Sequence, residues 1–255
     1  MLASLAAALL ALASAAGKAP PAPAFVVVID PGHGGPQDGA VAPDGVTCEK
    51  DLTLEIARRV AAALKKQGGR VILTRTGDIE VPLANRAAIA NAIRADLFVS
   101  IHLNSMPTAE ARERTSGVET YFLSADASDG HANAVAAREN ADRIAGEPEP
   151  DPADPVGAIL DDLEDAESLS GSSRLAYAVH ERLVATLGTE DRGVKQAPFY
   201  VLAGARMPAV LLEVGFISHQ ADAARLRTPE YQEQIAGAIA DGVKAFRVEG
   251  RRASK

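Results

Sequence analysis

Aromatic residues are scarce in this sequence, and tryptophan is absent. Phe, Tyr and Trp make up 4% of the 255 residues, so an aromatic platform for stacking bases or sugars finds little support. Basic charge is also short, because 34 Asp and Glu outnumber 26 Lys and Arg and the formal net charge is −8. A nucleic-acid-binding protein is expected to carry a basic face. Both shortages therefore argue against nucleic acid as a partner.

Cysteine occurs only once, at Cys48. A single cysteine excludes an intrachain disulfide and any zinc cluster built from thiolates. Apolar residues are plentiful by comparison, since 47% of the chain is hydrophobic and 24% is charged. A chain of this length and composition can form a full core, either as one large domain or as a domain with a long insertion.

The first 24 residues have the composition of an export signal and a linker. Residues 1–16 are almost wholly Leu, Ala and Ser, and no charge occurs before Lys18. This apolar run is too short to span a bilayer comfortably, and the small residues at its end suit a signal peptidase. We therefore expect a signal peptide and Pro/Ala linker over 1–24, a secreted, periplasmic protein, and no stable membrane span. Basic residues that usually precede such a run are missing, and an amphipathic N-terminal helix is the alternative interpretation.

The stretch 26–35 anchors the rest of the chain. Its first four residues are apolar and predict a strand buried on both faces; Asp30-Pro31-Gly32 then breaks the strand, and His33 follows. Open α/β sheets bind ligands beyond the carboxyl ends of their strands. His33 is therefore well placed to bind a metal or a substrate. A glycine-rich turn whose histidine only caps a loop is the alternative.

Strands and helices alternate along most of the remaining sequence. This alternation predicts βαβ units, and hence an α/β fold with a mostly parallel central sheet flanked by helices on both faces. We expect one domain over 25–247 and a frayed basic tail over 248–255. The expected helices have apolar faces within 52–64, 83–93, 175–187 and 235–246, and the further expected strands cover 70–74, 96–101, 117–123, 199–202 and 207–214.

Residues 124–173 interrupt this alternation. Composition predicts helices over 132–144 and 159–163, whereas the Pro-rich run 147–155 can hardly form regular structure. The second half of the segment is strongly acidic. Its simplest interpretation is a solvated surface insertion.

Three apolar strands end at His33, His102 and Glu213, and Glu49 stands at the start of the first helix. If the strands are parallel neighbours, these side chains meet at one edge of the sheet. Two imidazoles and one carboxylate form a catalytic zinc set with a position left for water. Bound zinc lowers the pKa of that water from about 15.7 to about 7, and a second carboxylate then serves as general base. Glu49 and Glu213 are the two candidates for ligand and base.

Each of these residues also has a structural interpretation. A glutamate at a strand end is often paired with Arg or Lys, and a histidine there is often only hydrogen-bonded; three such residues together favour chemistry. The remaining histidines, His131, His180 and His219, have no comparable position, and we expect them to be structural.

Five motifs occur in order along the chain: IDPGHGG at 29–35, EKDLTL at 49–54, SIHLNS at 100–105, RGVK at 192–195 and PAVLLEVGFIS at 208–218. Together they resemble the zinc-dependent N-acetylmuramoyl-L-alanine amidases that cleave bacterial peptidoglycan. The resemblance implies that His33, Glu49 and His102 bind zinc and that Glu213 is the catalytic carboxylate. It also implies hydrolysis of the amide between N-acetylmuramic acid and the L-alanine of the stem peptide, in cell-wall remodelling and daughter-cell separation.

The resemblance gives the insertion a second interpretation. Cell-division amidases of this family carry an inserted segment at this position, in which a helix occludes the active site and a carboxylate reaches the zinc. An activator protein displaces that helix. By this resemblance, residues 124–173 include an autoinhibitory segment, and Glu139 is the blocking ligand. Its rivals for that role are Asp161, Asp162 and Glu164.

Two other functions stay open. A different zinc peptidase, such as a carboxypeptidase acting on stem peptides, would keep the fold and change the bond that is cleaved. A non-catalytic wall-binding or regulatory module is the second alternative. The complete set of two histidines and two glutamates argues against it, because pseudoenzymes commonly lose a ligand or the base.

Overall fold

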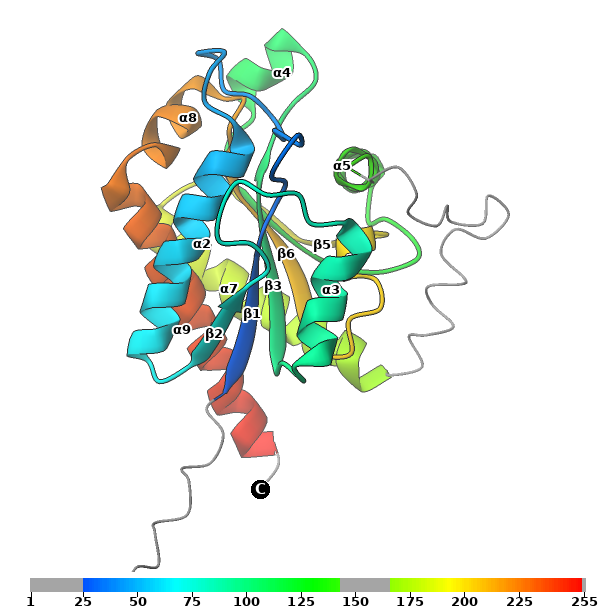
Figure 1. Cartoon of the computed structure of the whole chain (residues 1–255). Coiled ribbons are helices and arrows are strands. Elements are labelled where there is room, and N and C mark those ends of the chain that lie inside the picture. The colour runs from blue at the N-terminus through cyan, green and yellow to red at the C-terminus, as the bar shows by residue number, and fades with distance from the viewer. Residues whose placement is uncertain (1–24, 143–165, 254–255) are drawn as a thin grey trace, which may run out of the picture.

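A computed structural model describes residues 25–142 and 166–253, and the expected signal peptide lies outside them. Six strands form one sheet in the order β2-β1-β3-β6-β4-β5 (Figure 1). No helix within these residues is both long and apolar enough to cross a membrane. The strands are β1 (Val26–Pro31), β2 (Arg70–Leu73), β3 (Leu97–Asn104), β4 (Val118–Leu123), β5 (Asp191–Ala197) and β6 (Ala209–Phe216).

The sheet is mixed. Strands β1, β2, β3 and β6 are parallel to one another, whereas β4 pairs antiparallel with β6 and parallel with β5. Two consecutive strands can be parallel only if a crossover connection carries the chain back to the end of the sheet where the first strand began. The connection from β3 to β4 contains only the short helix α4 (Ala109–Arg114), so the chain turns back where β3 ends. The predicted mostly parallel sheet therefore holds for every pairing except β4 with β6.

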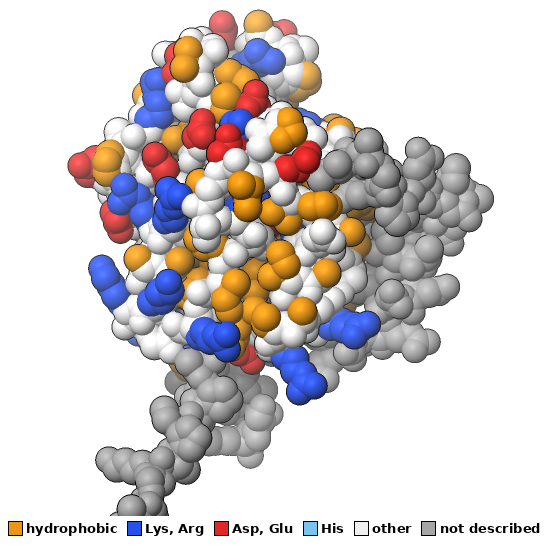
Figure 2. All heavy atoms as spheres, viewed as in Figure 1, with side chains coloured by type: hydrophobic (Ala, Val, Ile, Leu, Met, Phe, Trp, Pro, Cys, Tyr) orange, Lys and Arg blue, Asp and Glu red, His pale blue; other side chains and the backbone are white. Residues whose placement is uncertain are grey.

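Helices cover both faces of this sheet, as predicted. Helices α2 (Glu49–Lys66), α7 (Ala166–Leu187) and α9 (Pro229–Ala253) pack on one face, and α3 (Leu83–Ala92) packs on the other. Strand β1 shows why both faces are apolar: Val27 and Ile29 point to the first face, and Val28 points to the second. The outer side of α3 exposes small hydrophobic side chains (Figure 2).

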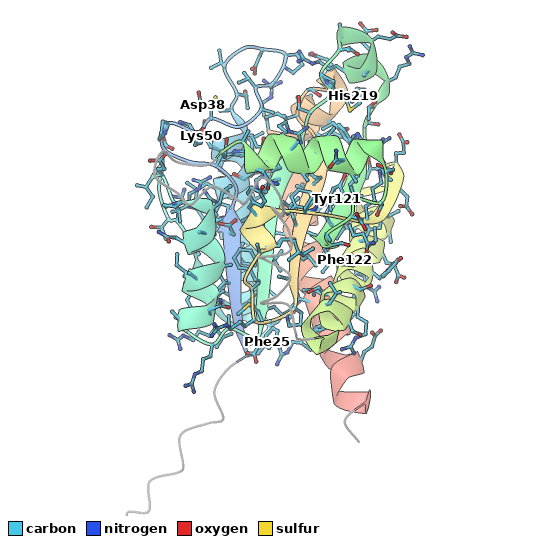
Figure 3. The ribbon with its side chains drawn as sticks, turned by 90° about the vertical axis from the view of Figure 1, so that its right-hand side faces the viewer. Phe25, Asp38, Lys50, Tyr121, Phe122 and His219 are labelled. Atoms are coloured by element: carbon cyan, nitrogen blue, oxygen red, sulfur yellow. The ribbon has the colours of Figure 1, made fainter. Side chains whose placement is uncertain are left out.

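Three short helices lie near the carboxyl ends of β1, β3 and β6. Helix α4 and helix α8 (Gln220–Leu226) stand above the sheet, and α5 (Gly130–Asn140) lies across the strand ends (Figures 1 and 3). Helix α5 falls largely within the predicted 132–144 helix of the insertion. The predicted helix over 159–163 lies outside the described residues.

The strand predicted over 199–202 is wrong. Those residues form a 3-10 turn, η1 (Tyr200–Leu202), in which Val201 and Leu202 are buried beneath α3. The edge strand is β5 instead, and its sequence DRGVKQA is mostly polar and half-exposed. An apolar run thus packs as a turn, while a polar run completes the sheet.

Of the frayed tail expected over 248–255, the structure describes residues 248–253, and these are helical instead. Helix α9 continues through Ala253. The guanidinium of Arg247 lies 3.9 Å from the ring centroid of Phe25, and this cation–π contact holds the helix at the predicted end of the domain.

Two glycines of α9 give a matched test of how tightly α7 and α9 pack. A Cβ on Gly242 would lie 2.5 Å from Val179 Cα, whereas a Cβ on Gly237 would meet nothing within 4 Å. We expect Gly242→Ala to lower the free energy of unfolding by about 1–3 kcal/mol through overpacking. Gly237→Ala should raise it by up to about 1 kcal/mol, because alanine favours a helix. Urea unfolding measures both, and equal effects of the two substitutions would contradict this packing.

Candidate metal centre

Four residues predicted from the sequence meet where β1, β3 and β6 end. His33 follows β1, and His102 of β3 lies beside Glu213 of β6 in the strand register. Glu49 comes from the first turn of α2. All four side chains are buried. The structure thus brings the two histidines and the two glutamates together at one edge of the sheet.

Glycine at position 32 allows the two imidazoles to approach each other. A Cβ on Gly32 would lie 2.4 Å from His102 Cε1, which no side chain could tolerate. His33 itself adopts φ 60°, the left-handed region that non-glycine residues rarely occupy. The strand break after β1 therefore turns the His33 ring toward His102, with ring centroids 4.8 Å apart.

The ligand atoms of four residues face one point. His33 Nε2 lies 2.9 Å from Glu49 Oε1 and 3.4 Å from Glu139 Oε2. His102 Nδ1 lies 3.3 Å and 2.9 Å from the same two oxygens. All four atoms are within 4.8 Å of one another. Glu139, on α5, is thus as close to the imidazoles as Glu49 is.

This arrangement fits a divalent cation. His33 Nε2, His102 Nδ1 and Glu139 Oε2 are buried and have no hydrogen-bond partner. Buried polar atoms without partners are costly and rare, and a cation at their common centre would satisfy all of them. Imidazole nitrogens and carboxylate oxygens with no thiolate form a donor set that zinc accepts.

Neighbouring carboxylates shift the titration of both histidines. Burial alone would lower the pKa of His33, but the charge of Glu49 and the hydrogen bond with Asp142 raise it well above its ordinary value. Burial also opposes protonation of His102, but the Glu139 carboxylate outweighs it, so that the pKa of His102 rises to about 9. Negative charge thus dominates the field at this point, which is what a bound cation requires.

Hydrogen bonds from the backbone hold the Glu49 carboxylate. Its Oε1 accepts from the Leu103 N–H at 2.7 Å, and its Oε2 accepts from the Ala40 N–H at 2.9 Å. The other ring nitrogen of His33, Nδ1, contacts the carboxylate of Asp142 just after the end of α5. Such outer contacts fix the orientation of ligating side chains.

Glu213 stands beside the ligand atoms and is not one of them. Its Oε2 is buried without a hydrogen-bond partner, and its Oε1 lies 3.5 Å from Arg138 Nη2. Burial, followed by the charge of Glu139, raises the pKa of Glu213 well above its usual range. The raised pKa means that this carboxyl group holds a proton more readily than an exposed glutamate does.

Two buried arginines support the turn that carries His33, and the sequence analysis did not find them. Arg86 donates to the carbonyl oxygens of Pro31 and His33, at 2.9 Å and 3.0 Å, and to Asp30 Oδ1 at 2.9 Å. Arg75 donates to the carbonyl oxygen of Gly32 at 2.8 Å. A signal for Arg86 was present, because it falls on the buried stripe of α3, three residues after Leu83.

Glu119 is a further buried carboxylate beside the site, and no motif in the sequence marks it. It lies on β4 opposite Glu213, and its side chain is fully buried. Burial would raise its pKa, but His131 and Lys195 hold the pKa of Glu119 at about 2. The sequence shows only a glutamate inside an apolar strand, and its position opposite Glu213 follows from the antiparallel pairing of β4 with β6.

The three remaining histidines lie outside the candidate ligand cluster. His131 of α5 contacts Glu119 at 3.0 Å. His180 is buried between Thr120 and Asp191. His219 caps the start of α8.

Helix α5 covers the site. In Figure 3 it crosses the strand ends, with Tyr121 beneath it and His219 above it. Arg138 donates to Glu139 Oε1 at 2.9 Å and to the Ser105 carbonyl at 2.8 Å, and Glu139 is buried. A groove of about 1070 Å³ runs from His33 and Glu139 outward between loop 37–45, α4 and α8. The rival carboxylates at 161, 162 and 164 lie outside the described residues.

Comparison with known proteins agrees with this geometry. The sequence profile described as N-acetylmuramoyl-L-alanine amidase matches residues 27–245. The N-acetylmuramoyl-L-alanine amidase AmiA of Escherichia coli strain K12 is 35% identical over 223 residues, covering 87% of this chain and 75% of AmiA. A crystal structure of N-acetylmuramoyl-L-alanine amidase from Clostridium difficile 630 has a TM-score of 0.68 at 29% identity, covering 89% of this chain and 98% of that one. The CwlD amidase from Clostridioides difficile, solved in complex with the GerS lipoprotein, has a TM-score of 0.66 at 26% identity, covering 88% and 98%.

The arginine support gives a stability prediction. Arg86→Met removes the cation beside buried Asp30, so we expect the free energy of unfolding to fall by about 3–5 kcal/mol. The double substitution Asp30→Asn with Arg86→Met should cost clearly less, because no buried charge is left without its partner. Urea unfolding of the three proteins measures this, and a loss under about 1 kcal/mol for Arg86→Met would contradict the role given to it.

Proposed function

This chain belongs to the N-acetylmuramoyl-L-alanine amidase family, and from that premise we propose that it is a zinc-dependent enzyme that hydrolyses the amide between N-acetylmuramic acid and the L-alanine of the peptidoglycan stem peptide. The observation that carries the proposal is the convergence of unpartnered, buried imidazole nitrogens and carboxylate oxygens beside a further buried glutamate. The proposed product pair is a glycan strand and a free stem peptide.

His33, Glu49 and His102 are the proposed zinc ligands, and Glu213 is the proposed general base. The sequence alone left Glu49 and Glu213 as alternatives for these two roles. The distances favour Glu49 as ligand, since its Oε1 lies 2.9 Å and 3.3 Å from the two imidazole nitrogens. Glu213 is absent from the cluster of ligand atoms, which favours its use as the base.

The proton transfers are assigned to Glu213. When bound, zinc supplies Lewis acidity toward the amide carbonyl and lowers the pKa of water. Glu213 takes the proton from the attacking water and returns it to the leaving nitrogen. Burial raises its pKa, and so does the charge of Glu139 while α5 is in place, which favours retention of the proton between the two transfers.

Helix α5 is proposed to hold the enzyme in a resting state. Glu139 approaches both imidazoles, and the neighbouring Arg138 approaches Glu213, so two consecutive residues block both the zinc ligands and the base. Activity then requires α5 to leave. By analogy with the CwlD amidase, which was solved in complex with the GerS lipoprotein, a protein activator is the proposed means of displacing it.

The proposed location is the cell envelope. An exported, periplasmic enzyme is favoured by the apolar run and linker over 1–24 and by the position of peptidoglycan outside the cytoplasm. The proposed biological role is cell-wall remodelling and separation of daughter cells.

Metal content and product analysis test the zinc proposal together. We expect one zinc ion per chain, loss of most of it in His33→Ala and His102→Ala, and full retention in Glu213→Gln. Because a general base contributes about 10²–10⁴-fold, Glu213→Gln should lose activity by that factor while its zinc remains. The measurements are elemental analysis and mass spectrometry of digested peptidoglycan, with exposed Glu181→Gln as the control.

The products also separate the alternatives. Free stem peptides that begin with L-alanine are expected from an amidase, whereas a carboxypeptidase would release a carboxyl-terminal residue. A wall-binding module would release nothing and would be indifferent to Glu213→Gln. Either of these last two outcomes would overturn the proposed function.

Release of α5 should activate the enzyme. Replacing Arg138 and Glu139 together with alanine removes charge-assisted hydrogen bonds worth about 1.5–3 kcal/mol each. We therefore expect basal dye release from labelled peptidoglycan to rise by about tenfold or more, at unchanged zinc content. Asn133→Ala, on the exposed side of α5, should have no effect. Unchanged activity in a folded, zinc-loaded double variant would refute the resting-state role of α5.

A further inference from the structure

Asn104 lies between the candidate site and the buried carboxylate of Glu119. Its side chain is fully buried at the end of β3. The amide nitrogen Nδ2 donates to Glu119 Oε2 at 2.6 Å. The amide oxygen Oδ1 faces the other way and accepts from the Ser105 N–H at 2.8 Å and from Arg138 Nη2 at 3.1 Å.

Glu119 fixes which end of this amide faces the site. An ionised carboxylate only accepts hydrogen bonds, and the pKa of Glu119 is held at about 2. Turning the Asn104 amide over would set its oxygen against that carboxylate. The orientation therefore follows from the chemistry of Glu119, and Asn104 presents an acceptor toward Glu213.

Most hydrogen-bond partners of Glu119 do not belong to α5. Glu119 accepts from Tyr121 Oη at 2.8 Å and from Arg192 Nε at 3.0 Å, and it lies 3.4 Å from Lys195 Nζ. These three donors come from β4 and β5. His131, which contributes most to lowering the pKa of Glu119, belongs to α5. Departure of α5 would remove that contact and leave the donors from β3, β4 and β5, which hold Glu119 against Asn104.

The position of Arg138 Nη2 shows where an N–H donor can lie between Asn104 and Glu213. This nitrogen lies 3.1 Å from Asn104 Oδ1 and 3.5 Å from Glu213 Oε1. Two acceptor oxygens therefore flank one point, immediately beside the cluster of ligand atoms. With α5 displaced, that point would lose the donor that Arg138 supplies and could receive one from the substrate.

We propose that Asn104 is a further catalytic residue, whose Oδ1 accepts a hydrogen bond from the N–H of the scissile amide, and that Glu119 is the positioning residue that sets this orientation. The proposal rests on the amidase function proposed above. It deepens that function by assigning the group that binds the leaving nitrogen.

The proposed contact fits the balance of the reaction. The oxygen of water bonds to the carbonyl carbon, and Glu213 takes one water proton. The C–N bond then breaks as the nitrogen takes that proton from Glu213, giving a carboxylic acid and an amine. The amide nitrogen already carries one hydrogen, and holding that hydrogen on Asn104 Oδ1 directs the nitrogen lone pair toward Glu213.

An ester analogue isolates this contact. The test compares a muramoyl peptide substrate with an analogue that has L-lactate in place of L-alanine. In the analogue, an ester oxygen without hydrogen replaces the amide N–H. The readout is the ratio of amide to ester hydrolysis rates, measured on the same sample of full-length, zinc-loaded protein. Because both rates scale with the fraction of open, folded enzyme, the ratio is insensitive to the position of α5 and to partial unfolding.

Asn104→Ala should lower the amide-to-ester ratio by about tenfold, the value of one hydrogen bond. Glu119→Gln should lower the amide-to-ester ratio similarly. The side-chain oxygen of the new glutamine would accept from Arg192, so its NH₂ group would face Asn104. The Asn104 amide would then turn over and present its NH₂ donor to the site. Tyr121→Phe removes one donor from Glu119 without touching Asn104, and it should leave the ratio within about twofold.

The outcomes separate the two proposals. Failure to cleave the amide even after Arg138 and Glu139 are both replaced with alanine, which releases α5, would overturn the amidase function itself. Amide cleavage with an unchanged ratio in Asn104→Ala would overturn the role of Asn104 alone. If Asn104→Ala does not fold, Asn104→Ser takes its place, because serine keeps a hydroxyl donor for Glu119. The amide-to-ester ratio of that variant then decides the question.

Discussion

Negative charge buried at the ends of three strands is the constraint on which this structure depends. Glu49 and Glu139 lie among side chains that are almost completely excluded from water, and their oxygens face imidazole nitrogens that have no hydrogen-bond partner. Burying such groups is unfavourable unless a countercharge is supplied. A divalent cation, as proposed above, would supply it at the point where the four ligand atoms meet. The fold can thus be understood as a scaffold that holds four ligand atoms around one position.

The scaffold fixes those atoms through the backbone as much as through side chains. Arg75 and Arg86 bind the carbonyl groups of the turn before and at His33, and two backbone N–H groups hold Glu49. On the opposite side, Glu119 holds Asn104. A site proposed to hold its metal both with α5 in place and after α5 leaves needs walls that stay unchanged, and none of these contacts belongs to α5.

Sequence patterns could predict the parts of this site that follow from strand ends. His33, His102 and Glu213 each follow or end an apolar run, and the α/β class followed from the alternation of such runs. Arg75, Glu119 and Asn104 could not be predicted in the same way, because their roles depend on which strands become neighbours. The reversed direction of β4 sets Glu119 opposite Glu213, and no local pattern reports that reversal. Strand β5 was missed for a related reason: an edge strand is half-exposed, so its residues are polar.

X-ray absorption at the zinc edge of the resting full-length protein tests whether these imidazoles and carboxylates hold one metal ion. We expect a zinc shell of nitrogen and oxygen only, at about 2.0–2.1 Å, with the scattering of two imidazoles and with carboxylate oxygens from Glu49 and Glu139. In Glu139→Ala, the carboxylate oxygen of Glu139 should be lost from the zinc shell, and both imidazoles should remain bound. A metal shell without imidazole, or one with a sulfur ligand from Cys48, would show that His33 and His102 do not form the proposed zinc site.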